Sequence, residues 1–260
     1  MKKIIYKLLQ KLYKPILVEL YQVNMKLDSI MNKMSISADS VINIDNLKLF
    51  IPNAPRDILQ NEILQNVQFY EIDLLRQLDK YLSTDSVIID IGANIGNHTV
   101  YWGRVTKVKQ IYAFEPISNT CEILLQNIKI NDLENIVKTY NVALGNSKSK
   151  AEIQDFINNN IGATSIIEND SGSLTLDMLD NIEEIFLEKK IDFVKIDVEG
   201  FEKYVLQGAS KFFVKYKPKV FIESFSGLNQ YDFVIDFFNL LGYKQPVPFP
   251  GGNYLFIHPE

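Results

Sequence analysis

Four residues with the spacing Asp-x-Gly-x-Asn-x-Gly form the first stretch of this sequence that could do chemistry. Asp90, Gly92, Asn94 and Gly96 follow the apolar run Val87–Ile89, which is typical of a strand buried on both faces. Glycine lets the backbone approach a ligand closely, and the helix expected after the turn begins with unpaired N–H groups. A strand, a tight turn and a helix start in this order predict a nucleotide site.

A second acid ends the next predicted strand, Ile111–Phe114. Glu115 stands about 20 residues beyond the first strand, where a carboxylate can accept hydrogen bonds from both hydroxyls of a ribose. A dinucleotide fingerprint needs glycine where this chain has Asn94 and Asn97, so an NAD-dependent enzyme is disfavoured. A strand and a glycine turn without any ligand remain the alternative, but that interpretation does not explain the acid at position 115.

A second group of charges alternates with apolar residues along Phe193–Glu199. Lys195, Asp197 and Glu199 therefore share one face of a predicted strand. Central parallel strands are normally apolar on both faces, and an unpaired buried charge is costly. We expect these charges either to pair with one another or to face the carboxyl end of the sheet, where open α/β sheets bind ligands. A purely structural Lys195–Asp197 ion pair is the alternative.

Strand and helix patterns alternate from Val87 onward, which predicts an α/β fold with a mostly parallel sheet and helices on both faces. The last strands, Tyr243–Val247 and Tyr254–His258, are expected to close the sheet as an antiparallel hairpin. Ala151–Phe156 is expected as an extra edge strand, and residues 162–165 as a loop.

Three parts of the chain are expected: an N-terminal helical extension (1–35), a helical cover with a peripheral strand (36–82) and the main domain (83–260). Apolar residues in the extension follow a 3-4-3-4 spacing, the pattern of a coiled coil, interrupted at Pro15. We predict a homo-oligomer formed through this helix; packing on the same chain, or contact of its lysines with an anionic membrane, are alternatives. In the cover, Glu71 would either cap a helix or contact a ligand.

Composition limits the class of protein further. The 260-residue chain has 47% hydrophobic residues and a formal net charge of −5, so nucleic acid is not expected as the main partner. A single cysteine, Cys121, excludes an internal disulfide framework and fits a reducing compartment. No signal peptide and no apolar run of about 18 residues are visible. We expect a cytoplasmic protein, at the inner face of the membrane if the N-terminal lysines bind lipid.

Five motifs in one order resemble the FkbM-type family of class I S-adenosylmethionine-dependent methyltransferases. They are Asp90–Gly96, Phe114–Pro116, Asn141–Leu144, Thr175–Asp177 and Lys195–Gly200, and the resemblance covers roughly residues 46–259. It implies a Rossmann-like fold, S-adenosylmethionine as cofactor and transfer of a methyl group to a hydroxyl. Because members of this family commonly methylate sugars, the resemblance favours a sugar of a bacterial surface glycan or its precursor as acceptor. A non-sugar metabolite is the alternative.

The resemblance also implies a set of cofactor-binding residues. The expected set is Asp90, Gly92, Ala93, Asn94, Gly96, Asn97, His98, Glu115, Pro116, Asn141, Val142, Ala143 and Asp197. Many methyltransferases place an acid after the third strand to bind the adenine amino group, and this chain has none. We therefore expect adenine to contact the Asn141 side chain or the backbone near Val142.

An alcohol is a poor nucleophile, so methyl transfer to oxygen needs a base or a metal. Asp197 and Glu199 are the first candidates for the base, followed by Glu223 at the end of another predicted strand, with Lys195 as their partner. His98 has a suitable intrinsic pKa but is expected to pack beside the cofactor. Converging carboxylates could also bind Mg²⁺; no metal ligands are assigned, because the sequence shows no dense acidic cluster. A non-catalytic nucleotide-binding scaffold is the last alternative.

Overall fold

The computed structural model describes residues 40–54, 56–155, 164–224 and 230–259. The chain divides into two compact units, Met1–Ser40 and Val41–Glu260. The predicted N-terminal coiled coil, with its expected roles in self-association and membrane contact, lies outside the described residues. Among these residues, no helix combines the length and the apolar character needed to cross a membrane.

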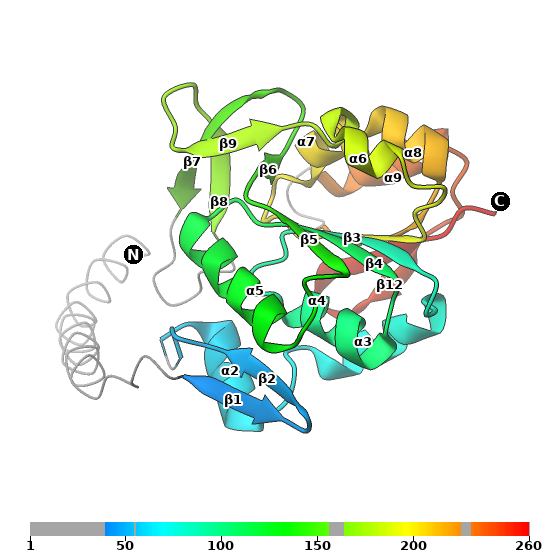
Figure 1. The fold of residues 1–260 in the computed structure, drawn as a ribbon. Coiled ribbons are helices and arrows are strands. Elements are labelled where there is room, and N and C mark those ends of the chain that lie inside the picture. The colour runs from blue at the N-terminus through cyan, green and yellow to red at the C-terminus, as the bar shows by residue number, and fades with distance from the viewer. Residues whose placement is uncertain (1–39, 55, 156–163, 225–229, 260) are drawn as a thin grey trace, which may run out of the picture. The chain divides into compact units, whose positions relative to one another are not determined.

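A seven-stranded sheet with the order β12-β13-β11-β10-β3-β4-β5 is the centre of the second unit (Figure 1). Its five parallel strands are β3 (Val87–Ile91), β4 (Gln110–Phe114), β5 (Val137–Tyr140), β10 (Phe193–Ile196) and β11 (Lys219–Glu223). The last two strands, β12 (Val247–Phe249) and β13 (Asn253–Phe256), form an antiparallel hairpin paired to β11. The expected α/β fold with a final hairpin is confirmed, although β12 begins where the predicted strand ends.

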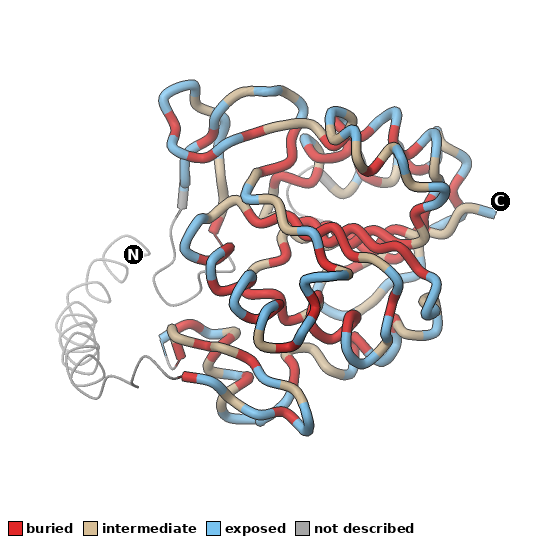
Figure 2. Tube along the Cα trace, in the orientation of Figure 1, coloured by how far each residue is buried: buried red, intermediate tan, exposed pale blue. Residues whose placement is uncertain are grey.

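Alternating side chains of the strands face two separate apolar cores, which is why the tube in Figure 2 is red along the central strands. Ile88 of β3 and Phe193 of β10 face the core formed with one group of helices: α2 (Ile58–Asn66), α3 (Ile72–Leu78), α4 (Asn97–Tyr101) and α5 (Ser118–Ile130). Ile89 and Val194 face the core formed with the other group: α6 (Glu183–Phe186), α7 (Glu202–Gln207), α8 (Ser210–Tyr216) and α9 (Gln230–Leu240). The sheet is therefore covered on both faces, as expected.

A second sheet of four strands has the order β6-β9-β7-β8. Its strands are β6 (Ala143–Leu144), β7 (Ser149–Asp155), β8 (Ser165–Glu168) and β9 (Leu174–Asp177). The prediction of an edge strand at Ala151–Phe156 is right about the strand but wrong about its place, because β7 lies inside this second sheet. The buried residues Ala151, Leu174 and Leu176 form a small core of their own. Ser165, expected in a loop, begins β8.

The cover before the main sheet packs into the same core as the sheet. It consists of the hairpin β1 (Val41–Ile44) and β2 (Leu47–Phe50) with helices α2 and α3. The side chain of Asn127 in α5 joins this hairpin to the turn after β3. Its Oδ1 accepts from the N–H of Phe50 (2.5 Å), and its Nδ2 donates to the carbonyls of Phe50 (3.0 Å) and Ile95 (2.9 Å). The cover is therefore fixed directly to the part of the fold that carries the first motif.

Candidate functional site

The glycine turn, Gly92–Gly96, leaves β3 at the carboxyl edge of the sheet. Gly92 and Gly96 have φ values of +78° and +88°, which favour glycine. A Cβ atom on Gly92 would lie 1.8 Å from the carbonyl oxygen of Asp197. This position therefore requires glycine both for its backbone conformation and for the close approach of the segment after β10.

Glu115 follows β4 and holds the glycine turn through backbone hydrogen bonds. The N–H of Asn94 donates to its Oε2 (3.0 Å), and the N–H of Ile117 donates to its Oε1 (2.9 Å). Only 6% of Glu115 is exposed. Burial raises its pKa to about 7, against the lowering effect of these two backbone hydrogen bonds. Each carboxylate oxygen accepts one of these bonds and has a second lone pair for a further donor.

A cavity of about 900 Å³, here called the turn cavity, opens above the glycine turn. Most of the predicted site residues line it: Gly92, Ala93, Asn94, Asn97, His98, Glu115, Pro116, Val142, Ala143, Lys195, Asp197 and Glu199. The sequence motifs, which are far apart along the chain, therefore meet in one place.

Three residues of the expected cofactor set lie outside the lining of the turn cavity. Asp90 is fully buried and accepts a hydrogen bond from Thr99 Oγ1 (2.6 Å). Gly96 precedes α4, and a Cβ atom there would lie 2.6 Å from the Leu124 side chain. The Asn141 amide donates to the carbonyls of Glu115 (2.8 Å) and Pro116. The local contacts of these three residues position the walls of the cavity.

Sequence reasoning missed several residues of the cavity wall. Leu59, Tyr70, Phe114, Ile117, Thr120, Leu144, Thr164, Ile166, Val198 and Phe201 also line the turn cavity. These residues are mostly apolar. Phe114, Leu144 and Val198 lie inside the sequence motifs but were not predicted as site residues. The others follow no motif and lie in the cover, at the start of α5, in or next to the second sheet and before α7.

The side chain of Asn97 holds the backbone of the cover at the wall of the turn cavity. Its Oδ1 accepts from the N–H of Tyr70 (2.9 Å) and its Nδ2 donates to the carbonyl of Tyr70 (3.0 Å). Glu71 follows in the left-handed region, with φ +55°. Glu71 is the N-cap residue of α3, as expected, but its side chain makes no capping hydrogen bond. Its carboxylate instead lies 3.5 Å from His98 Nε2, at the mouth of the cavity.

The ammonium of Lys195 connects the glycine turn with the acids on both sides of it. Nζ donates to the carbonyl of Gly92 (2.7 Å) and lies 3.4 Å from Asp90 Oδ1 and 3.3 Å from Asp197 Oδ2. Lys195 is 3% exposed. Burial works against its charge, but the carboxylates of Asp197 and Asp90 prevail and raise the pKa of Lys195 above its ordinary value. Lys195 is thus a charged group buried in the floor of the site.

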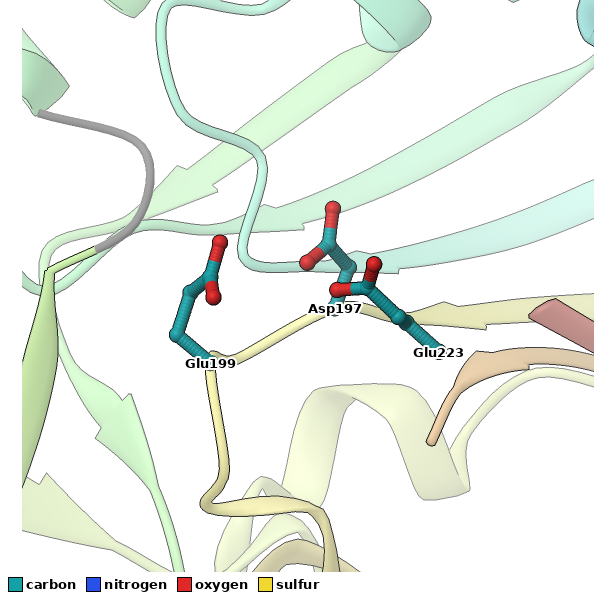
Figure 3. A group of neighbouring side chains, drawn as sticks. All are labelled: Asp197, Glu199 and Glu223. Carbon is teal, nitrogen blue, oxygen red and sulfur yellow. The ribbon is translucent and has the colours of Figure 1, made fainter. Parts of the chain in front are cut away.

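Three carboxylates converge beside this ion pair, as Figure 3 shows. Asp197, Glu199 and Glu223 follow or end the neighbouring strands β10 and β11, and each offers an oxygen within 4.8 Å of the others. Burial first, and the charge of Asp197 second, raise the pKa of Glu199 to about 7 and that of Glu223 to about 9. The acidic cluster that the sequence did not reveal is formed by the pairing of β10 with β11.

These acids line a second cavity of about 650 Å³, here called the acid pocket. Its wall also includes Tyr70, Glu71, His98, Phe221 and Asn253. The turn cavity and the acid pocket share eight lining residues: Leu59, Tyr70, Glu71, Asn94, His98, Lys195, Asp197 and Glu199. A molecule in one cavity therefore meets a molecule in the other beside Asp197.

Comparison with known proteins agrees with this geometry. Residues 90–244 match the family model described as the methyltransferase FkbM domain, which is more than half of the chain. The chain belongs to the FkbM methyltransferase family. The matched region begins at Asp90 and includes the glycine turn, Glu115 and the three converging acids Asp197, Glu199 and Glu223.

Individual relatives of this FkbM family member are distant. The methyltransferase sdnD of Sordaria araneosa is 26% identical, over an alignment that covers 50% of this chain and 62% of the relative. The chain thus spans less than two-thirds of that relative. The crystal structure of methyltransferase FkbM from Methylobacillus flagellatus KT has a TM-score of 0.50 at 19% identity, covering 74% of this chain and 47% of that chain. The similarity to this crystal structure shows the fold of the chain.

A more distant solved structure, TrmK of M. capricolum, is described in complex with the cofactor product S-adenosylhomocysteine. It has a TM-score of 0.40 at 16% identity, over 73% of this chain and 68% of that chain.

Replacing Lys195 with Met should destabilise this FkbM family member by about 3–5 kcal/mol, because Asp90 would keep a buried charge without a cation to pair with. The double variant Lys195→Met/Asp90→Asn should regain part of that loss. Lys190→Met is the matched control: Lys190 also pairs with an acid, Asp192 (3.0 Å), but its side chain is 57% exposed, so its removal should cost at most about 1 kcal/mol. Urea unfolding measures all three; equal losses for Lys195→Met and Lys190→Met would contradict the structural role.

Proposed function

We propose that this protein transfers a methyl group from S-adenosylmethionine to a hydroxyl group, on a sugar of a bacterial surface glycan or its precursor. The cofactor would occupy the turn cavity and the acceptor the acid pocket. One observation carries the proposal: the two cavities adjoin along a shared wall that includes Asn94 of the glycine turn and the acids Asp197 and Glu199.

The residues of the turn cavity fit S-adenosylmethionine. Glu115 would accept hydrogen bonds from the ribose hydroxyls through the lone pairs left free by Asn94 and Ile117. The backbone at Gly92, where no Cβ atom fits, lets the amino-acid part approach the turn closely. When bound, the cofactor supplies an electrophilic methyl group. The protein has to orient the acceptor oxygen and remove one proton.

Asp197 and Glu199 are the proposed acceptors of that proton. The ammonium of Lys195 lies 3.3 Å from Asp197 Oδ2 and holds that carboxylate in place. The other oxygen of Asp197 can then face the acid pocket. With a pKa of about 7, Glu199 is partly ionised at neutral pH and can accept a proton. Glu223, with a pKa of about 9, is protonated there and can donate a hydrogen bond. The cluster thus holds both a base and a donor at neutral pH.

Replacing Glu115 should weaken cofactor binding. Glu115→Ala removes the charged acceptor for the ribose, worth about 1.5–3 kcal/mol, so the dissociation constant for S-adenosylmethionine should rise about 10- to 100-fold. Glu115→Gln keeps one acceptor and should lose less. Because the pKa of Glu115 is raised to about 7, the affinity of the unmodified protein should increase as the pH rises through that value. Titration calorimetry at several pH values tests this; an unchanged dissociation constant in Glu115→Ala rules out the ribose role.

Replacing the proposed base should abolish turnover and leave cofactor binding intact. Asp197→Asn should lower kcat about 10²- to 10⁴-fold, whereas Glu122→Gln on the exposed side of α5 should not. At saturating S-adenosylmethionine, where the protonation of Glu115 does not limit binding, kcat should rise with pH through about 7 as Glu199 loses its proton, and Glu199→Gln should remove that limb of the profile. Full turnover in Asp197→Asn would exclude it from the mechanism.

A chelator distinguishes the base from a metal site formed by the same acids. We expect EDTA to leave turnover unchanged, because Asp197 is already paired with Lys195 and Glu223 is protonated at neutral pH, which makes the cluster a weak cation ligand. Loss of activity that Mg²⁺ restores would instead assign Asp197, Glu199 and Glu223 to a magnesium ion.

The charge of the acid pocket limits the acceptor. Glu71, Asp197, Glu199 and Glu223 line it, and the one lysine among the described lining residues, Lys195, is already neutralised by Asp90 and Asp197. Phosphate and carboxylate groups would be repelled there, whereas the hydroxyls of a neutral sugar find many hydrogen-bond acceptors.

A methyl-transfer screen with labelled S-adenosylmethionine tests this preference. Neutral glycosides and glycans should accept the label, and the same sugars carrying a phosphate next to the reacting hydroxyl should not. Labelling of a non-sugar alcohol alone would favour the small-metabolite alternative. Binding of S-adenosylmethionine without methyl transfer to any acceptor would favour the non-catalytic nucleotide-binding scaffold.

A further inference from the structure

One hydroxyl in the wall of the turn cavity is buried without a hydrogen bond. Thr164 lies just before β8, is 8% exposed and lines the turn cavity. Its Oγ1 has no hydrogen-bond partner within the described parts of the chain. An unsatisfied buried hydroxyl costs about 1–3 kcal/mol. A ligand in the turn cavity that forms a hydrogen bond with this hydroxyl would explain why it is buried there.

The surroundings of Thr164 suit a flat ring. The same cavity is lined by Ala143 and Leu144 of β6, Ile166 of β8 and Phe201 before α7. Ala143 and Phe201 belong to the small core of the second sheet, and Ile166 packs against it. Apolar walls with few polar groups are typical of sites that bury a ring and fix its orientation by one or two hydrogen bonds.

The order of the strands places the base of a nucleotide on this wall. The glycine turn follows β3, Glu115 follows β4, and Val142 and β6 follow β5, so the three segments succeed one another along one edge of the sheet. If the amino-acid part lies at the first segment and the ribose at the second, the base lies at the third. Asn141, expected to meet the base, has its amide nitrogen bonded to the carbonyls of Glu115 and Pro116.

We infer that the hydroxyl of Thr164 forms a hydrogen bond with the amine-bearing edge of adenine. The residue before the second sheet's strand β8 then supplies a polar group to the third segment, in place of the acid that the chain lacks after β5. This inference rests on the proposed function, because it requires an adenosyl cofactor in the turn cavity.

The test compares two ligands on three variants by calorimetry. S-adenosylhomocysteine carries the adenine amine; its analogue with an unsubstituted purine has only a hydrogen in that place. Thr164→Val removes the hydroxyl and keeps the shape, so binding of S-adenosylhomocysteine should weaken about 5- to 10-fold, and the preference over the unsubstituted-purine analogue should shrink by the same factor. Thr164→Ser, which keeps the hydroxyl, should retain the preference. Thr175→Val, on an exposed residue of β9 in the same sheet, should behave like the unmodified protein.

Thermal unfolding without ligand separates this role from a structural one. Because the hydroxyl has no partner within the described residues, Thr164→Val should unfold at the same or a higher temperature than the unmodified protein. Unchanged affinity in Thr164→Val, or an equal loss for both ligands, would overturn the inference and leave the proposed function standing. Failure of the unmodified protein to bind either ligand would overturn both.

Discussion

The buried ammonium of Lys195 is the contact on which the arrangement of the site depends. It joins the carbonyl of Gly92 and the carboxylate of Asp90, both at the end of β3, to the carboxylate of Asp197, just after β10. A lysine that is 3% exposed stays charged only when anionic partners repay its loss of water. The segment after β10 must therefore stay close to the glycine turn. This closeness in turn leaves no room for a side chain at Gly92.

Burial also sets the protonation of the acids around this contact. The pKa values of Glu115, Glu199 and Glu223 are all raised, in each case chiefly by burial. A carboxyl group whose pKa is raised by folding favours the folded state while it is protonated. That contribution is complete below the ordinary value of 4.5 and is lost as the pH rises through about 7 for Glu115 and Glu199 and about 9 for Glu223. The same burial that brings the pKa values of Glu115 and Glu199 close to neutrality therefore lowers the stability of the folded protein at alkaline pH.

The second sheet and the cover complete a cavity whose floor belongs to the central sheet. Asn97 and Asn127 act alike, since each uses its side-chain amide to hold the backbone of the cover, at Tyr70 and at Phe50. On the opposite side, β6 and β8 contribute apolar walls from the small core around Leu176. The charged residues of the site therefore lie at or after strand ends, and its enclosure depends on the cover and on the second sheet.

The sequence by itself determined the fold class, the FkbM family and the residues of the motifs, because strand periodicity, glycine spacing and acids at strand ends are local patterns. Only the tertiary structure decided which of these residues meet. The pairing of β10 with β11 brings Glu223 to Asp197 and Glu199, and the buried pairing of Lys195 with Asp90 as well as Asp197 depends on β10 lying beside β3. The place of β7 in a second sheet and the presence of Thr164 in the cavity wall depend on contacts between segments distant in sequence, and these leave no periodic signal in the chain.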